Sequence, residues 1–383
     1  MAFHEGAALR SPKPSAALSR QAAVPIFAAV LLIRVWMAAH FHGNFDSNSF
    51  RAAAELAGNG HNVYAGTKLY NYSPVWAYVL ALLWRVTGRQ FSSFVFGLGL
   101  IQIASDTASA FVLALIARRL GRSAGNGRYA ALLFFANPVS VVASSAHGQF
   151  DGLAILALLG AIAAASKRPA CRQALVATGL AISLLIKHVT LFQPLLFSRR
   201  VRRGGLSDVQ LAFPYLVFAA SFLPFLSAAR EIWQAVVVYG AHGAWPGGLS
   251  RAITVPARWS TGVHTAALVA ASAWAIRNGR SEAVPRASLL LLLSTLVFLP
   301  GFALQYLVWP IALGSLYPSA GLGLYSLVAS LFYCTSAVSL NWPLPVRFDE
   351  LAVYAAAGLW LTLEAARRRR PRVGPGASRA TFG

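Results

Sequence analysis

The sequence has few acidic residues. It holds 11 aspartates and glutamates against 33 lysines and arginines, which gives a formal net charge of +22 over 383 residues. Charged residues of both signs make up only 11% of the chain, well below the roughly 25% that is usual in soluble domains. Cysteine is also scarce, with two residues. These absences exclude an ordinary soluble protein and a disulfide framework.

The chain is rich instead in apolar residues, which make up 57% of it. A helix that spans a bilayer needs about 20 apolar residues, so the chain has room for roughly a dozen spans. We therefore predict an all-α polytopic membrane protein of about 12 transmembrane helices, within a range of about 10 to 13, whose external loops carry short interfacial helices.

The basic residues lie mostly in short blocks between apolar runs. Such blocks are typical of cytoplasmic loops in membrane proteins and do not indicate a nucleic-acid partner. The blocks comprise Arg118, Arg119, Arg122 and Arg128, then Arg199, Arg200, Arg202 and Arg203, and finally residues 367–370. We expect a single integral membrane domain over residues 1–383. Its parts would be a cytoplasmic tail at 1–20, external loops at 43–72 and 229–260, and a basic cytoplasmic tail at 367–383.

Two apolar runs differ from simple transmembrane spans. The run at residues 173–197 holds Lys187 and His188 at its middle, which predicts two short or bent helices. The run at residues 73–87 is short for a span, so we expect it to be interfacial or half-inserted.

The first external loop is the one long polar segment near the start of the chain. It opens with Asp46, continues as a helical pattern over residues 47–56, and breaks at Gly58 and Gly60. Aromatic residues follow the break, with Tyr64 and Tyr72 among them. Such a loop is either a solvated connector or an active-site lid, and an acid followed by aromatics suits the binding of a sugar or a headgroup.

A second polar segment, NPVSVVASSAHGQFDG, occupies residues 137–152 between two apolar runs. Pro138 lets a helix start or kink there, and His147, Gln149 and Asp151 gather where the segment emerges. These side chains would bind a hydroxylated or phosphorylated headgroup. Alternatively, they form a polar helix end that satisfies its own backbone groups.

One acid lies inside an apolar run. We interpret Asp106 as a buried carboxylate that accepts hydrogen bonds from Ser105, Thr107 and Ser109. A proton relay, as a transporter would need, is the alternative.

These segments together resemble the GT-C glycosyltransferases. The resemblance rests on Phe45-Asp46 after the first helix, on Tyr72-Ser73-Pro74, on Asn137-Pro138 leading to the HGQFD corner, and on Lys187. It covers roughly residues 22–200. Within the superfamily, the corner is most similar to lipid-linked-oligosaccharide glucosyltransferases and to bacterial polyprenyl-phosphate-sugar mannosyltransferases.

The resemblance implies a membrane hexosyltransferase of the EC 2.4 class. It would transfer mannose or glucose, with inversion, from a polyprenyl-phosphate donor to a lipid-linked or other external glycan or glycolipid acceptor. Asp46 matches the family's general base, because an acceptor hydroxyl needs a carboxylate to take its proton. Ser47 and Asn48 follow it, so no Asp-x-Asp pair is present and we expect no obligatory metal or other cofactor, although a divalent metal stays open.

The remaining site residues are assigned by type. Lys187 is the first candidate for the cation that contacts the donor phosphate, because an ionisable residue among apolar ones indicates a functional site. The donor-binding set comprises Lys187, His147, Gln149, Asp151, Arg251 and Arg258. The sugar- and acceptor-binding set comprises Tyr64, Tyr72, Trp76, Gln305 and Tyr306. We expect Asp46, His147, Asp151 and Lys187 to converge on one external cavity.

Arginine outnumbers lysine 29 to 4, which is typical of a GC-rich bacterial genome. We therefore expect a multi-pass protein of the bacterial inner membrane, surrounded by membrane lipids, with its site on the external face. Two alternatives come from other classes: a secondary transporter or flippase for a lipid-linked or sugar substrate, and a non-catalytic membrane scaffold.

Overall fold

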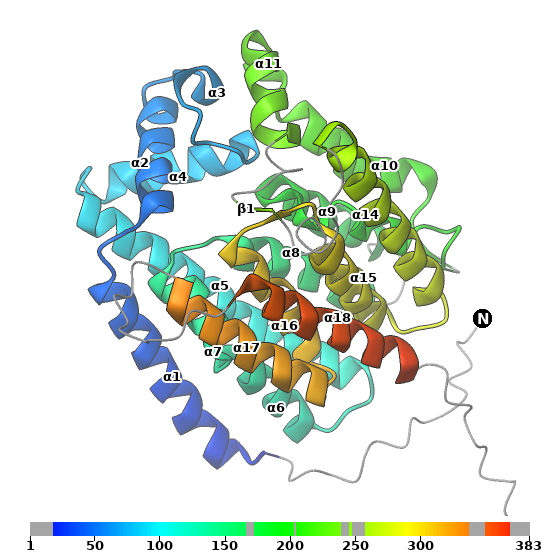
Figure 1. Cartoon of the computed structure of the whole chain (residues 1–383). Helices are drawn as coiled ribbons and strands as arrows, with labels where there is room; N and C mark the ends of the chain where they lie inside the picture. The colour runs from blue at the N-terminus through cyan, green and yellow to red at the C-terminus, as the bar shows by residue number, and fades with distance from the viewer. Residues whose placement is uncertain are drawn as a thin grey trace, which may run out of the picture.

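The computed structural model describes residues 18–165, 172–202, 204–238, 245–246, 257–336 and 349–367, and this part of the chain is mostly helical (Figure 1). Its first half comprises α1 (Arg20–His40), α2 (Phe45–Gly58), α3 (Val63–Gly66), α4 (Pro74–Val86), α5 (Phe91–Arg119), α6 (Ala124–Phe135), α7 (Pro138–Val141), η1 (Val142–Ala146), α8 (Asp151–Ala165), α9 (Arg172–Ile186), η2 (His188–Thr190) and η3 (Gln193–Phe197). Its second half comprises α10 (Asp208–Ala220), η4 (Leu223–Ala228), α11 (Ala229–Ile232), η5 (Trp233–Val238), β1 (Trp245–Pro246), α14 (Ala257–Gly279), α15 (Val284–Phe298), β2 (Gly301–Phe302), η6 (Leu304–Val308), α16 (Trp309–Ser315), α17 (Ala320–Ser336) and α18 (Glu350–Arg367). The two short strands pair antiparallel, with Trp245 opposite Phe302.

Among the described residues, two helices are long and apolar enough to cross a membrane, α1 and α5. Two bent pairs raise the number to four if each pair is one span: α6 with α7 and η1, bent by 53°, and α10 with the helices up to Val238, bent by 48°. The prediction of a helical protein with apolar spans is confirmed, whereas about 12 spans are not shown. Fewer spans are shown because several apolar helices are short: α8, α9 and α15 have 15 residues each. Such helices rise about 22 Å, which is less than the roughly 30 Å of a bilayer core.

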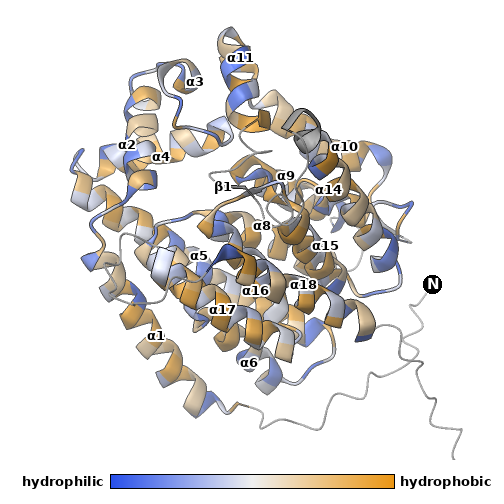
Figure 2. Cartoon of the chain, viewed as in Figure 1, coloured by the Kyte–Doolittle hydropathy of each residue, from blue (hydrophilic) through white to orange (hydrophobic). Residues whose placement is uncertain are grey.

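Apolar residues make up much of the helices at the outside of the bundle, as the colours of Figure 2 show. On α1, which lies at the edge of the bundle, Val24, Leu32 and Trp36 are exposed, and only Ala23, Arg34 and Ala38 are buried. Apolar residues on an outward face are what a bilayer requires.

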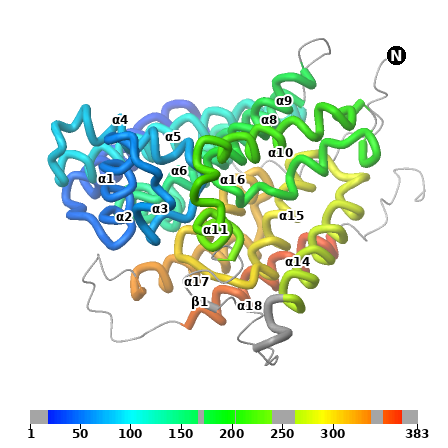
Figure 3. Tube along the Cα trace, turned by 90° about the horizontal axis from the view of Figure 1, so that it is seen from above, coloured from blue at the N-terminus to red at the C-terminus, as the bar shows by residue number. Residues whose placement is uncertain are grey.

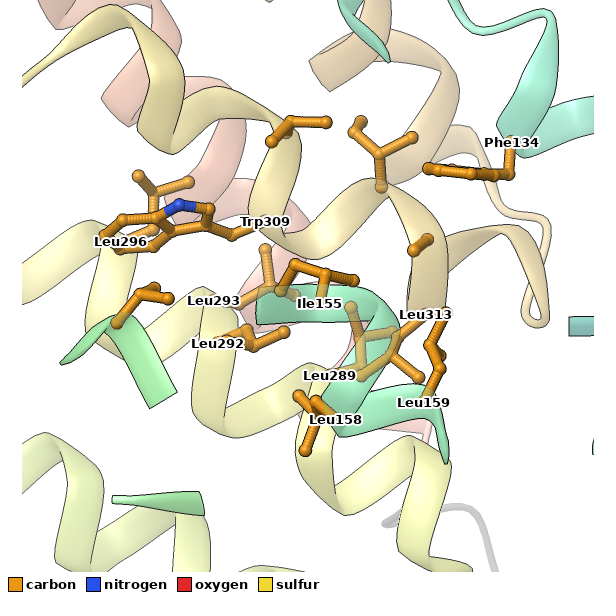
Figure 4. Close-up of a cluster of buried hydrophobic side chains, with 14 of the residues drawn as sticks. Phe134, Ile155, Leu158, Leu159, Leu289, Leu292, Leu293, Leu296, Trp309 and Leu313 are labelled. Atoms are coloured by element: carbon orange, nitrogen blue, oxygen red, sulfur yellow. The ribbon is translucent and has the colours of Figure 1, made fainter. Parts of the chain in front are cut away.

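The main core lies between α8, α15, α16 and α6 (Figure 4). Helix α15 is apolar all round, and its residues from Ala287 to Leu296 are all buried, because it has neighbours on every side. The side chains drawn in Figure 4 include Ile155, Leu158 and Leu159 of α8, Leu289, Leu292, Leu293 and Leu296 of α15, Trp309 and Leu313 of α16, and Phe134 of α6.

Helices α2, α3 and α4 form a separate cap at one end of the bundle, near α11 (Figures 1 and 3). The predicted helix at residues 47–56 is confirmed within α2, which the Asn44 side chain caps by accepting from the Ser47 backbone N–H at 2.9 Å. The helix ends at Gly58, and Gly60 takes a φ of 75° in the turn that follows. Helix α4 has 13 residues, about 20 Å, and is therefore too short to span a bilayer.

Two breaks place polar groups at this same end. Pro138 is at the first turn of α7, the π-helix η1 follows, and Gly148, with a φ of 68°, turns the chain into α8. The interruption predicted in the run at 173–197 is also confirmed, because α9 ends at Ile186 and Lys187 is extended before the 3-10 helices η2 and η3.

Candidate functional site

The first turn of α2 meets the corner between η1 and α8. The Asn44 side chain donates to the backbone oxygen of His147 at 3.3 Å, which ties the two segments together. Gln149 Nε2 then donates to Asp46 Oδ2 at 2.5 Å, and His147 Nε2 lies 3.3 Å from the same oxygen. The structure therefore brings Asp46 into contact with two residues that lie about 100 positions later in the sequence.

His147 also contacts a residue that sequence analysis missed. Its Nδ1 lies 2.5 Å from the hydroxyl oxygen of Tyr333 on α17. The neutral tautomer with its proton on Nε2 satisfies both contacts, because the Tyr333 hydroxyl donates to Nδ1 while Nε2–H donates to Asp46. We call Asp46, His147, Gln149 and Tyr333 the Asp46 cluster. Its carboxylate is the accessible part, because the Asp46 side chain is 26% exposed whereas that of His147 is 9% exposed.

A second cluster lies beside the first and is closed. Lys187 Nζ donates to Asp151 Oδ2 at 2.6 Å, and Trp309 Nε1 donates to Asp151 Oδ1 at 2.5 Å. Asp151 is fully buried and Lys187 is 4% exposed. The ammonium also lies over three rings, 5.1 Å from Tyr72, 5.2 Å from Phe150 and 5.6 Å from Tyr306. We call Asp151, Lys187 and Trp309 with these rings the Lys187 cluster.

This arrangement gives Lys187 a partner within the protein. A buried carboxylate and ammonium must neutralise each other to offset their loss of hydration. Asp151 is also in the first turn of α8, where the helix dipole favours a negative charge. The Lys187 ammonium is therefore neutralised by Asp151, and the buried Lys187 cluster lies beside the Asp46 cluster.

The aromatic side chains of the first loop that follow Gly60 are buried in the protein and do not extend into solvent. Tyr64, Tyr72 and Trp76 are 3%, 5% and 2% exposed. Trp76 stacks on Phe150 with a centroid distance of 4.1 Å, and the Tyr64 hydroxyl donates to the backbone oxygen of Tyr72 at 2.7 Å. Burial raises the pKa of the Tyr64 phenol well above its ordinary value. These side chains fix the cap on the corner.

The other assigned residues are distributed differently. Gln305 and Tyr306 are both buried on η6, and Tyr306 joins the Lys187 cluster through its ring. Arg251 lies outside the described residues. Arg258 is in α14, but its side chain lies outside the described part of the chain.

A third buried pair lies below the corner, formed by Arg34 and Asp106 at 2.8 Å. The interpretation of Asp106 as a satisfied buried acid is confirmed, but its partners are Arg34 and Ser140 rather than the neighbours on its own helix. The Ser105 and Ser109 hydroxyls have no partner within the described residues. The sequence does contain a feature that points to Arg34, because it is a single charged residue inside the first apolar span. Tyr333 gave no comparable signal, since buried tyrosines are common in apolar helices.

A comparison with protein families gives one match: the model described as GPI transamidase subunit PIG-U, over residues 21–234. The match covers more than half of the chain. The chain belongs to the PIG-U family. Among curated proteins, no relative matches it.

The PIG-U match includes Asp46, the corner at residues 147–151 and Lys187, whereas Trp309 and Tyr333 lie beyond it. Each cluster therefore combines side chains from the matched region with side chains from the C-terminal third of the chain.

The family corrects the functional predictions. A PIG-U protein is a subunit of a GPI transamidase, so the assignment to the GT-C glycosyltransferases, the hexosyltransferase activity and the polyprenyl-phosphate-sugar donor with its glycan acceptor are wrong. The transporter or flippase alternative is wrong for the same reason. The four segments behind the resemblance specify where a polar corner forms at the end of a helix bundle. They do not specify a reaction, and the cation expected to contact the donor phosphate is paired with Asp151.

The prediction of a membrane protein agrees with the structure and the family, but PIG-U is a protein of the endoplasmic reticulum membrane and not of a bacterial one. A high ratio of arginine to lysine reflects codon usage, which carries no information about a compartment.

Proposed function

We propose that this chain is a non-catalytic membrane subunit of a GPI-transamidase-type complex, and that its Asp46 cluster receives the headgroup of the GPI anchor. The other subunits of the complex and the proteins that receive the anchor would be its partners. The observation that carries the proposal is the Asp46 carboxylate, which is held in place by Gln149 and His147 yet remains 26% exposed.

The chemistry of transamidation supports this choice of ligand. A transamidase replaces one amide by another, so the anchor must bring an amine, which is an ammonium group at neutral pH. A carboxylate held by neutral donors binds an ammonium group or glycan hydroxyls through charge-assisted hydrogen bonds. The Lys187 cluster is buried and its two charges are paired, so it adds no net charge beside the Asp46 cluster.

The contacts of His147 support a binding role rather than a catalytic one. A histidine that acts as general base must present a free ring nitrogen to the proton it removes. In this chain Nε2 faces Asp46 and Nδ1 faces Tyr333, so both nitrogens are engaged. The chemical step would then belong to another subunit.

The topology follows from the same proposal. The Asp46 cluster and the loops at residues 43–72 and 229–260 would face the lumen of the endoplasmic reticulum. The arginine blocks and the tails at residues 1–20 and 367–383 would face the cytoplasm, all within one membrane domain. Gln305 and the buried aromatic residues would support the headgroup site from behind.

The test uses cells that lack their own PIG-U. The chain and its Asp46→Ala variant are expressed there, and two quantities are measured: co-precipitation of the other transamidase subunits, and the surface level of a GPI-anchored reporter. We expect the variant to assemble normally and to lower the reporter at least about tenfold, since a hydrogen bond to a charged group contributes about 1.5–3 kcal/mol.

Asp208→Ala is the matched control. Asp208 is also in the first turn of a helix, but its side chain is 70% exposed and pairs with Arg200 at the surface. If Asp46→Ala restored the reporter as well as Asp208→Ala did, the headgroup role of Asp46 would be wrong. If the unaltered chain failed to co-precipitate any other subunit, the assignment to the complex itself would be wrong.

A further inference from the structure

An open groove of about 550 Å³ runs along α8, between α5 and α9. Its lining is apolar except for Thr178 and Arg119. Part of its floor is Gly160, where an added Cβ would meet nothing within 4 Å. The groove exists because small residues, Ala157, Gly160, Ala163 and Ala164 among them, occupy the face of α8 between its two neighbours.

The dimensions of the groove decide what fits into it. Leu153 and Ala164 line its two ends on α8, and the eleven residue steps from one to the other rise about 16 Å. This is about half of the roughly 30 Å bilayer core, the depth of one leaflet. A single hydrocarbon chain of that length can lie along the groove.

The charge at one end of the groove indicates which headgroup the ligand carries. Arg119, at the last turn of α5, lies at the end of the groove farther from Asp151, and its guanidinium donates to the backbone oxygen of Ala163. Among the residues that the structure describes, no carboxylate pairs with Arg119. Arg118 precedes it and is exposed. A half-buried guanidinium with spare donors above an apolar groove is suited to a phosphate with an attached hydrocarbon chain.

We propose that this groove binds one acyl chain of an anionic phospholipid of the cytoplasmic leaflet, with the lipid phosphate on Arg119. The leaflet follows from the arginine block at residues 118–128, which marks the cytoplasmic side. Anionic lipids are enriched there, and each nearby arginine adds about 1 kcal/mol to their attraction. The Arg119 end of the groove lies at the opposite end of α8 from the Asp46 cluster, and the proposal does not depend on the role proposed for that cluster.

The experiment measures lipid binding to the full purified chain in detergent by native mass spectrometry. Dioleoyl phosphatidylserine and dioleoyl phosphatidylcholine carry the same chains and differ in headgroup charge. We expect the unaltered chain to bind phosphatidylserine roughly fivefold more tightly. Arg119→Gln should remove that preference, since glutamine can still donate to Ala163 but carries no charge. Gly160→Leu should weaken the binding of both lipids by filling the groove.

Gly323→Leu is the control for Gly160→Leu. Gly323 is also an exposed glycine in an apolar helix, with nothing within 4 Å of an added Cβ, but it lies on α17 away from the groove. Leucine favours a helix over glycine at either position, so both variants should fold. The proposal is overturned if Arg119→Gln keeps the preference for phosphatidylserine, or if Gly160→Leu binds lipid as well as Gly323→Leu.

Discussion

The Arg34 guanidinium and the Asp106 carboxylate form a buried ion pair, 2.8 Å from Nη1 to Oδ2, that joins α1 to α5 beneath the break between α6 and α7. Arg34 Nη2 also donates to the backbone oxygen of Phe135 at 2.7 Å and to the Ser140 hydroxyl at 2.8 Å. The last carbonyls of a helix need donors from outside it, and Arg34 supplies one at the end of α6. The pair thereby positions the bent segment that leads to His147.

Replacing Arg34 by Met should lower the free energy of unfolding by about 3–5 kcal/mol, because Asp106 would remain buried without its partner. The double variant Arg34→Met with Asp106→Leu should recover part of that loss, since no charge is then left uncompensated. The double variant should recover only part of the unfolding free energy, because the backbone oxygen of Phe135 has lost the donor that Arg34 supplied. Chemical unfolding of the two single variants and the double variant in detergent measures the coupling, and strict additivity would contradict it.

Replacing Lys187 by Met should cost a similar amount, about 3–5 kcal/mol, because it leaves the fully buried Asp151 without a cation. Asp46→Asn is the comparison, since the Asp46 side chain is part-exposed and its loss of charge should cost less than about 1 kcal/mol. Unfolding curves for both variants test the distinction. Equal losses of unfolding free energy would mean that the Lys187 cluster is no more closed to solvent than the Asp46 cluster.

Raising the pH above about 10 should destabilise the cap. Burial raises the pKa of the Tyr64 phenol, so the folded state keeps a proton that the unfolded state loses above the ordinary tyrosine pKa of about 10. The folded state then binds more protons, and stability falls as the pH rises from about 10 toward the folded pKa. Tyr64→Phe should reduce the slope of unfolding free energy against pH between about 9.5 and 11. It should not abolish the slope, because burial also raises the pKa of Tyr70.

Cysteine labelling tests the proposed topology. His61 and Ala124 are both exposed, in the first loop and at the start of α6, so both positions suit labelling. The neighbouring glycines do not, because a cysteine at Gly60 would be strained at a φ of 75° and Gly125 is buried. In sealed endoplasmic reticulum vesicles, whose cytoplasmic face is outward, an impermeant maleimide should label an Ala124→Cys variant that has no other cysteine. It should label the equivalent His61→Cys variant only after permeabilisation. The reverse pattern would place the Asp46 cluster on the cytoplasmic side.

Local features were predictable because their causes are local. The bounds of α2 follow from the Asn44 cap and the glycines at 58 and 60, and the end of α9 follows from Lys187 in an apolar run. The membrane class follows from composition, which needs no knowledge of packing. The contacts Asp46–His147 and Asp151–Lys187 join residues at ends or breaks of helices, where the sequence shows polar groups. The convergence of all four on one external cavity stays a prediction.

The partners of those residues depend on packing between distant segments. Asp106 pairs with Arg34 rather than with Ser105 or Ser109, because a charge deep in the bundle needs a countercharge more than a hydroxyl.

By itself, then, the sequence determined the membrane class, the helix ends and the location of a polar corner, because these depend on composition and on neighbours within a few residues. Only the tertiary structure decided that Lys187 is neutralised by Asp151 while Asp46 stays accessible, because that difference comes from Trp309 and Tyr333, which reach the corner from helices more than 150 residues away. The same carboxylates and cation would suit a transferase or a binding subunit, and their burial and pairing distinguish an open acid from a closed ion pair.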